Sequence, residues 1–338
     1  MTTIQRAALV VMLALVSVPV HAQDPPRTLA NYLVPQDVPR FALVIGVEHY
    51  DNFDHVPNAL NDLETAGSAL ERAGFTTIRR LPDATMRAVF DGLKEITQLV
   101  EGHERPAIVV VFFAGHGFQD REVNYIVPKN ASRESLIDDS IPISSIIVKL
   151  APRRAGLAIF FLDACRTLNS LLPDVETAEG PMRSHTGFWP VNNFDGAVLG
   201  FGPGFNQPAL SRAHLDDQNS PYTTALKMFL NIPALSMSEM FGEIYTFVKL
   251  VTQERQQPEV LVRARVDKIG FMPKVSPEAL LAEESHWRAT LDTNRYDCVK
   301  AFTVNYPDSR FTNAALRWIA EIPPGVPTTG GGIGCPTR

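Results

Sequence analysis

The sequence predicts an α/β fold of three layers, in which a mostly parallel six-stranded sheet lies between helices. Short apolar runs alternate along the chain with segments whose apolar residues recur at helical spacing, an order typical of parallel sheets. Two of the runs, 107–113 and 157–162, are rich in β-branched and aromatic residues, as expected of strands buried on both faces. With 338 residues, the chain can form one large domain or two small ones.

The first four strands are separated by helices whose ends follow from turn and cap residues. Gly74 stops the first helix, and Asp83 is expected to cap the second. A small hairpin around residues 124–127 and a helix over 143–150 separate the third strand from the fourth. The expected strands are 41–47, 76–81, 107–113 and 157–162, and the first two helices cover about 60–73 and 83–100.

The second half of the chain is less regular. Residues 167–194 contain Pro, Gly, Asn and Ser with little periodicity, which indicates a long mobile loop. Strands at 197–201 and 259–263, with helices near 221–231 and 237–254 between them, complete the sheet. Farther on, two helices around 279–291 and 313–322 flank residues 296–306 and resemble a fragment of a helical-hairpin repeat that has no second copy.

The N-terminus has the pattern of a secretory signal peptide. Arg6 is its only charged residue, an apolar run over 7–16 follows, and Pro19 precedes the small-residue site Val20-His21-Ala22. The run is short for a bilayer span, so we expect cleavage after Ala22, no stable membrane span afterwards, and a periplasmic or secreted protein. An uncleaved anchor is the alternative.

Five parts are therefore expected along the chain. These are a signal peptide (1–22), a linker rich in Pro and polar residues (23–39), the α/β domain (40–272), a small helical extension (273–322) and a disordered tail (323–338). The net charge of −6 and the lack of a basic run give no reason to expect a nucleic-acid partner.

Three cysteines occur in the chain, and their odd number suggests one free thiol. Cys298 and Cys335 both lie in the C-terminal part and could pair with each other. That pairing would leave Cys165 unpaired, as a nucleophile must be. The alternative, three free thiols, is equally compatible with the spacing.

A histidine and a cysteine follow two of the predicted strands. Run 107–113 leads into Ala114-Gly115-His116-Gly117, and run 157–162 leads into Asp163-Ala164-Cys165-Arg166. Functional sites of open α/β sheets lie at the carboxyl ends of strands, so His116 and Cys165 should meet at one edge, as a thiol nucleophile and its base must. A lone cysteine or histidine is more often a packing residue, but the paired placement favours catalysis.

The two motifs, separated by 49 residues, resemble the catalytic motifs of the caspase-like cysteine peptidases, in particular the bacterial metacaspase or orthocaspase group. The resemblance covers about residues 40–265 and includes similar segments at 41–46, 61–62, 124–125 and 219–222. It implies a caspase-like fold and a cysteine endopeptidase that forms an acyl-enzyme thioester.

The resemblance also implies roles for individual residues. Cys165 would attack the scissile carbonyl, and His116 would protonate the leaving amine and then activate water. The backbone N–H groups of Gly117 and Cys165 would form the oxyanion hole, for which a glycine permits close approach of the backbone. Protein or peptide substrates are therefore the expected partners.

Substrate preference is expected from the residues around the S1 pocket, which receives the side chain before the cleaved bond. Asp163 stands where caspases that cut after aspartate carry glutamine, and Asp62 matches a second acid of metacaspases and paracaspases. Carboxylates there would pair with a cationic side chain, so we expect cleavage after Arg, with Lys as an alternative. Ser220 and Tyr222 are further candidate substrate-binding residues. The alternatives are a turn cap for Asp163 and a solvated helix face for Asp62.

Three further expectations concern regulation and assembly. Asp138 and Asp139 match only part of the calcium cluster of metacaspases, so we expect no required cofactor and weak or no calcium binding. These acids could instead favour the start of the 143–150 helix. Arg183, in the predicted loop, is a candidate autoprocessing site. By resemblance the protein is expected to be a monomer.

Two other functions stay open. One is a catalytically silent binding or scaffold module that keeps the fold, because fold alone does not establish activity. The other is a hydrolase or acyltransferase that uses the same dyad on a non-peptide substrate.

Overall fold

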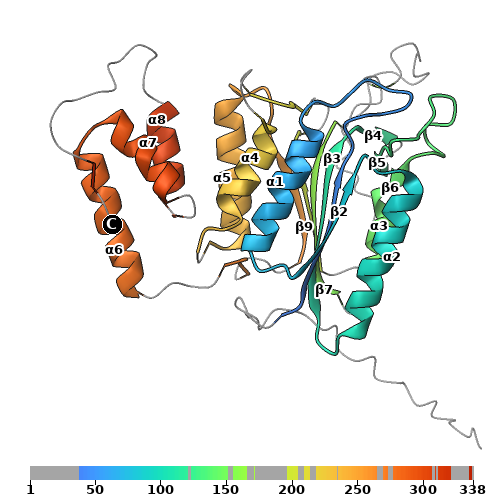
Figure 1. The fold of residues 1–338 in the computed structure, drawn as a ribbon, viewed down its shortest axis with the longest axis horizontal. Helices are drawn as coiled ribbons and strands as arrows, with labels where there is room; N and C mark the ends of the chain where they lie inside the picture. Colours follow the sequence, from blue (N-terminus) through green and yellow to red (C-terminus); the bar gives the residue numbers. More distant parts are fainter. Residues whose placement is uncertain are drawn as a thin grey trace, which may run out of the picture.

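Figure 1 shows the fold of the protein in a computed structural model. It describes residues 38–120, 123–150, 155–165, 171, 196–204, 209–213, 218–233, 235–264, 269–272, 277–306, 309, 311–320 and 335–336. The predicted signal peptide, the linker up to residue 37, Arg183 and most of the predicted loop and tail lie outside these residues, so the domain boundaries stay predictions.

A six-stranded sheet forms the centre of the molecule. Its order is β2-β1-β3-β7-β8-β9, and only the edge strand β9 runs antiparallel to its neighbour. This confirms the predicted mostly parallel sheet. The strands are β1 (Arg40–Gly46), β2 (Thr77–Pro82), β3 (Ala107–Gly115), β7 (Ala155–Ala164), β8 (Ala197–Phe201) and β9 (Glu259–Arg263).

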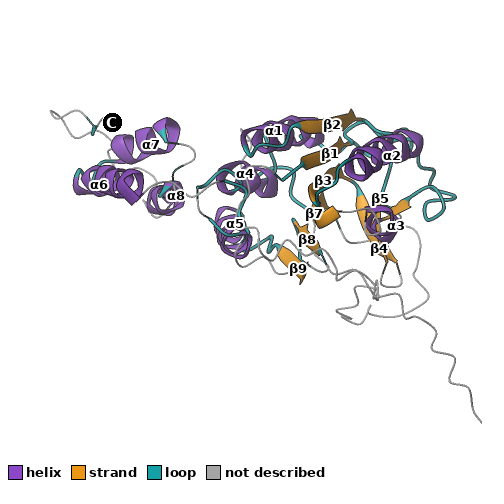
Figure 2. Cartoon of the chain, turned by 90° about the horizontal axis from the view of Figure 1, so that it is seen from below, coloured by secondary structure: helices purple, strands orange, loops and turns teal. Residues whose placement is uncertain are grey.

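Helices cover both faces of the sheet, as Figure 2 shows. Alternate residues of β1 and β3 point into two separate cores, one under α2 and α3 and one under α1, α4 and α5, as the period of two in a strand requires. The helices are α1 (Ala59–Arg72), α2 (Met86–Gly102), α3 (Ile143–Leu150), α4 (Pro221–Phe229) and α5 (Met237–Val251).

A small antiparallel sheet follows the predicted catalytic histidine directly. It consists of β4 (Gly117–Asp120), β5 (Val123–Ile126) and β6 (Ile141–Pro142). The hairpin expected around residues 124–127 is therefore confirmed. Because β4 begins at Gly117, the chain turns sharply between β3 and β4, and His116 occupies that turn.

The cap predicted for the second helix is wrong. Thr85, not Asp83, is the N-cap residue of α2, and its side chain accepts a hydrogen bond from the backbone N–H of Ala88. Asp83 has a left-handed backbone conformation with φ 44°. Its carboxylate instead accepts hydrogen bonds from the backbone N–H groups of Glu48 and His49, so it fastens the loop that follows β1.

Among the described residues, the C-terminal part has three helices where two were expected. They are α6 (Pro277–Asp292), α7 (Tyr296–Asn305) and α8 (Thr312–Ala320). Residues 296–305 are helical because Val299 and Phe302 bury one face against Trp287 and Ala315. A disulfide joins Cys298 to Cys335, and Cys165 is a free thiol, so the cysteine pairing that the sequence suggested is confirmed.

No helix within the described part of the chain combines the length and the apolar character needed to cross a bilayer.

Candidate active site

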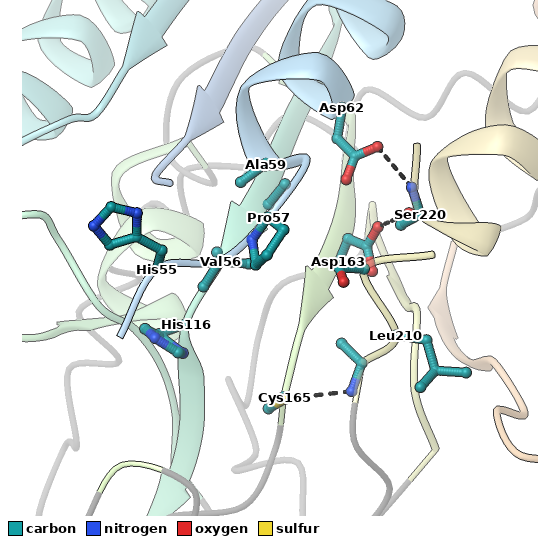
Figure 3. A pocket seen from close by; sticks show the side chains of 14 residues that line it. His55, Val56, Pro57, Ala59, Asp62, His116, Asp163, Cys165, Leu210 and Ser220 are labelled. Atoms are coloured by element: carbon teal, nitrogen blue, oxygen red, sulfur yellow. Dashed lines mark hydrogen bonds between the residues drawn. The ribbon is translucent and has the colours of Figure 1, made fainter. Parts of the chain in front are cut away.

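A pocket of about 190 Å³ opens at the carboxyl edge of the sheet (Figure 3). Five of the residues singled out from the sequence line it, namely Asp62, His116, Asp163, Cys165 and Ser220. They come from α1, from the ends of β3 and β7, and from the start of α4. Residues more than 150 positions apart in the chain therefore share one cavity.

The strand register explains why the histidine and the cysteine arrive together. β3 and β7 are parallel neighbours, and their last paired residues are Ala114 with Asp163 and Gly115 with Ala164. His116 and Cys165 are the next residues of the two strands, so both enter the pocket at the same level. A thiol and an imidazole at one site are the groups that nucleophilic catalysis requires.

The imidazole of His116 is held by the loop between β1 and α1. Its Nε2 lies 2.8 Å from the backbone carbonyl oxygen of Asp54. A carbonyl only accepts, so Nε2 carries a proton, and in the neutral ring Nδ1 then keeps a lone pair. The rings of Tyr50 and Phe53 pack against the imidazole, with centroids 4.6 and 6.2 Å away.

Tyr50 also fixes the backbone beside the imidazole. The His116 N–H donates to the Tyr50 hydroxyl at 2.7 Å, and that hydroxyl donates to the Val127 carbonyl at 3.2 Å. A Cβ on Gly115 would lie 2.6 Å from the same hydroxyl, and Gly115 has a φ of 154°. Only glycine fits this turn without displacing Tyr50.

Gly117 approaches the cysteine closely, although it does not line the pocket. A Cβ there would lie 2.9 Å from Cβ of Ala164 and 3.0 Å from the carbonyl oxygen of Cys165. The Gly117 backbone therefore packs directly against Ala164 and Cys165, where a side chain would clash. The oxyanion hole expected from the Gly117 and Cys165 N–H groups stays a prediction.

Both members of the candidate dyad are favoured in their neutral forms. Burial raises the pKa of the Cys165 thiol, against a hydrogen bond of 3.3 Å that the backbone N–H of Ala209 donates to Sγ. Burial also lowers the pKa of His116, against its bond to Asp54. The pair therefore rests as thiol and imidazole, and a proton must move as sulfur attacks.

Asp163 lies at the inner end of the pocket and is 5% exposed. Its Oδ2 accepts hydrogen bonds from the hydroxyl of Ser220 and, at 3.2 Å, from that of Thr223. Its Oδ1 is buried and has no partner among the described residues. Burial raises the pKa of Asp163 to about 6, although the two hydroxyls lower it.

Asp62 is the second buried acid of the pocket and is 3% exposed, so it does not lie on a solvated helix face. Its Oδ1 accepts from the Asn219 amide and from the Ser220 N–H, both at 2.9 Å. Burial and then the charge of Asp163 raise its pKa well above the usual value. Ser220 thus contacts both carboxylates.

The remaining predicted residues lie elsewhere. Tyr222 is fully buried in the core beneath α4 and does not line the pocket, because its position in the first turn of the helix faces the sheet. The Asp139 carboxylate accepts from the Ser132 N–H at 3.0 Å and the Ser135 hydroxyl at 2.6 Å. Neither Asp138 nor Asp139 belongs to a three-ligand cluster among the described residues.

The sequence reasoning missed three supports of the dyad, which are Tyr50, the Asp54 carbonyl and the Ala209 N–H. Tyr50 could have been found, because it follows β1 at the same carboxyl edge of the sheet. The two backbone groups carry no side-chain signal, so no residue pattern marks them.

Comparison with known proteins gives a consistent result. The family profile described as "Caspase domain" matches residues 39–268. The paracaspase of Dictyostelium discoideum is 26% identical over 141 residues, which are 40% of this chain and 32% of that protein. Human mucosa-associated lymphoid tissue lymphoma translocation protein 1 is 23% identical over 130 residues, 38% of this chain and 15% of its own length. The matches thus span a third or less of these two relatives.

Proposed function

Because the chain belongs to the caspase-domain family, we propose that it is an active cysteine endopeptidase that cleaves after Arg, with Lys as the second choice. The observation that supports this most strongly is the pocket itself. A free thiol and an imidazole share one cavity with two buried carboxylates, Asp62 and Asp163.

In the proposed reaction, Nδ1 of His116 takes the thiol proton as Cys165 attacks the scissile carbonyl. The acyl-enzyme thioester forms when the imidazolium returns that proton to the leaving amine. Water activated by the same imidazole then releases the acid. The N–H groups of Gly117 and Cys165 stabilise the oxyanion in both steps.

The two carboxylates give the proposed preference for a cation. A guanidinium has a planar fork of donors that suits carboxylate oxygens, and Asp163 Oδ1 is buried without a partner among the described residues. An arginine side chain would satisfy that oxygen and would neutralise the repulsion between the two acids. An aspartate side chain would add a third negative charge and would be rejected.

The test compares fluorogenic peptides that differ only in having Arg, Lys or Asp before the cleaved bond. We expect the order Arg, Lys, Asp in kcat/KM, no turnover by Cys165→Ala, and a loss of about 10- to 100-fold with Asp163→Asn, from the usual strength of a charged hydrogen bond. Asp91→Asn, on the exposed side of α2, is the matched control. A preference for Asp would refute the specificity, and failure of a peptidyl-Arg electrophile to label Cys165 would favour the silent binding module.

We also propose that the protein is exported and acts as a monomer in the periplasm or outside the cell. The support for export is the N-terminal sequence, with its apolar run and the site at Ala22, and the proposal of a monomer rests on the family resemblance. N-terminal sequencing of the protein from its native host should give Gln23 as the first residue. A protein that still begins at Met1 would contradict the proposal.

A further inference from the structure

The orientation of His116 depends on the loop over residues 47–58, here called the β1–α1 loop. Asp54 supplies the carbonyl that binds Nε2, and Phe53 supplies a ring against the imidazole. These contacts come from a segment without regular secondary structure, so something outside the loop must keep it in place.

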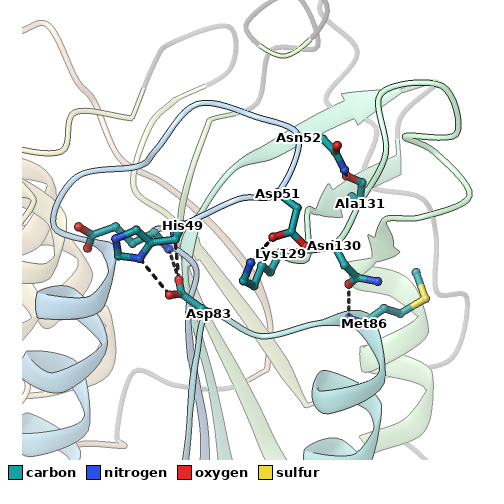
Figure 4. A network of polar contacts seen from close by, with 9 residues as sticks. His49, Asp51, Asn52, Asp83, Met86, Lys129, Asn130 and Ala131 are labelled. Atoms are coloured by element: carbon teal, nitrogen blue, oxygen red, sulfur yellow. Dashed lines mark hydrogen bonds and ion pairs between the residues drawn. The ribbon is translucent and has the colours of Figure 1, made fainter.

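The segment over residues 127–133 provides several contacts that anchor the β1–α1 loop (Figure 4). The Asp51 N–H donates to the Lys129 carbonyl at 3.1 Å, and the side chains of the same two residues form an ion pair. The Asn52 amide donates to the Ala131 carbonyl at 2.9 Å. All of these anchors hold the loop upstream of Phe53 and Asp54.

Arg133 is the anchor nearest to the imidazole contacts. Its Nε donates to the Asn52 carbonyl at 2.8 Å, and its guanidinium carbon lies 4.9 Å from the centroid of the Phe53 ring. Its Nη1 donates to the Leu171 carbonyl at 2.9 Å. The planar guanidinium of Arg133 thus binds the β1–α1 loop on one side and, on the other, the chain six residues beyond Cys165.

We propose that Arg133 is a positioning residue for His116. Arg133 aligns the imidazole by fixing the Asn52–Asp54 backbone, and it links this backbone to the chain that follows the nucleophile. The proposal rests on the peptidase function proposed above. Arginine suits the role because its fork satisfies two carbonyls at once while its face stacks on a ring. Lysine offers neither the fork nor the flat face.

The charge of Arg133 adds a second effect. Burial is the largest influence on the pKa of His116 and lowers it, the bond to Asp54 and the charge of Asp54 raise it, and the charge of Arg133 lowers it by the smallest amount. The other titratable groups around the ring or in the pocket are Tyr50, His55, Asp62, Asp163 and Cys165. Removing the guanidinium should therefore loosen the imidazole and weaken its bond to Asp54. Because that bond raises the pKa of His116 by more than the charge of Arg133 lowers it, the pKa should fall.

The experiment compares Arg133→Gln and Arg133→Lys with Arg87→Gln, a matched control because Arg87 lies exposed on α2. With a P1-Arg peptide, which has Arg directly before the cleaved bond, kcat of Arg133→Gln should fall about 10- to 100-fold. This is the usual effect of misplacing a catalytic group by about 1 Å. KM should change little, because the acids of the pocket are untouched. The acidic limb of kcat should move to lower pH in both Arg133→Gln and Arg133→Lys, because both weaken the Asp54 contact that raises the pKa of His116.

A second readout does not need turnover. The His116 imidazole is titrated by NMR with ¹⁵N-labelled histidine, and its signal is assigned by its loss in His116→Gln. The pKa should fall in Arg133→Gln and stay in place in Arg87→Gln. An unchanged pKa together with an unchanged kcat would overturn the proposal.

The two readouts separate failure of this inference from failure of the proposed function. If the wild type cleaves no peptide, the peptidase proposal fails, while the titration still decides whether Arg133 acts on His116. If Arg133→Gln does not fold, Arg133→Lys carries the test. A lower kcat in Arg133→Lys supports positioning, and wild-type kcat refutes it.

Discussion

Replacing Ser220 by alanine should damage the pocket in two ways at once. The Ser220 hydroxyl caps α4 by accepting from the Thr223 N–H at 2.9 Å, and it donates to Asp163. Losing the cap costs about 1 kcal/mol, and losing a buried bond to a charged group costs about 1.5–3 kcal/mol. We therefore expect Ser220→Ala to lower the free energy of unfolding by about 2–4 kcal/mol.

The same substitution should weaken binding of a P1-Arg substrate. The bond from Ser220 lowers the pKa of Asp163, so its loss shifts the carboxyl toward the neutral acid at pH 7, which cannot pair with a guanidinium. Stability is measured by urea unfolding, and KM is measured across pH. Thr223→Val is the matched control, because it removes the 3.2 Å bond to Asp163 and leaves the backbone cap of α4 intact.

Two outcomes of Ser220→Ala would contradict the role assigned to Ser220 and Asp163. If Ser220→Ala loses no more than the ~1 kcal/mol of a helix cap, and its KM follows pH as in the wild type, then Ser220 does not hold the carboxylate. A loss of stability without any change in KM would show that Asp163 plays no part in binding the substrate.

Four other outcomes are expected. The pKa of Asp163 is raised from 3.8 to about 6, so KM for P1-Arg peptides should rise about tenfold for each pH unit below 6. The stability that this carboxyl contributes is complete below pH 3.8 and is lost as pH rises through 6. A KM that does not change with pH would contradict the first expectation. Tyr50→Phe should lower kcat and remove about 1–3 kcal/mol of stability, because it leaves the half-buried N–H of His116 without its acceptor. An unchanged kcat and an unchanged urea midpoint would contradict this. Cys298→Ser opens a disulfide with a separation of 37 residues and should destabilise α6–α8 by about 2–4 kcal/mol, seen as faster hydrogen exchange there, with kcat unaffected; wild-type exchange would contradict it. Intact mass after incubation should show cleavage at Arg183 in the wild type and none in a variant without the thiol, and an uncut wild type would argue against autoprocessing.

Much of the fold follows from local pattern, and the exceptions have physical causes. The runs that became β3 and β7 are apolar on both faces, so their central places and the meeting of His116 with Cys165 could be predicted. Asp83 misled the prediction because both it and Thr85 are good caps, and the choice depends on a backbone turn that the sequence does not encode locally.

The supports of the site were harder to predict. The Asp54 carbonyl and the Ala209 N–H belong to every residue type, and only the folded chain places them against His116 and Cys165. Asp62 was recognisable by resemblance, but the bond to Ser220 that links it with Asp163 spans more than 150 residues. Such contacts are a property of the tertiary structure and leave no trace in periodicity.

The hydrogen bonds of Ser220 to Asp62 and Asp163 determine when the site can be completed as the chain is synthesised. A chain growing from its N-terminus contains the histidine and the cysteine once residue 165 has emerged, yet the donors that hold Asp62 and Asp163 arrive only with residues 219–223. A nascent or truncated chain that ends between these points contains the cysteine and the histidine but none of these donors for Asp62 and Asp163. Selectivity is therefore the last property of the site to be completed, and fragments of that length should not retain it.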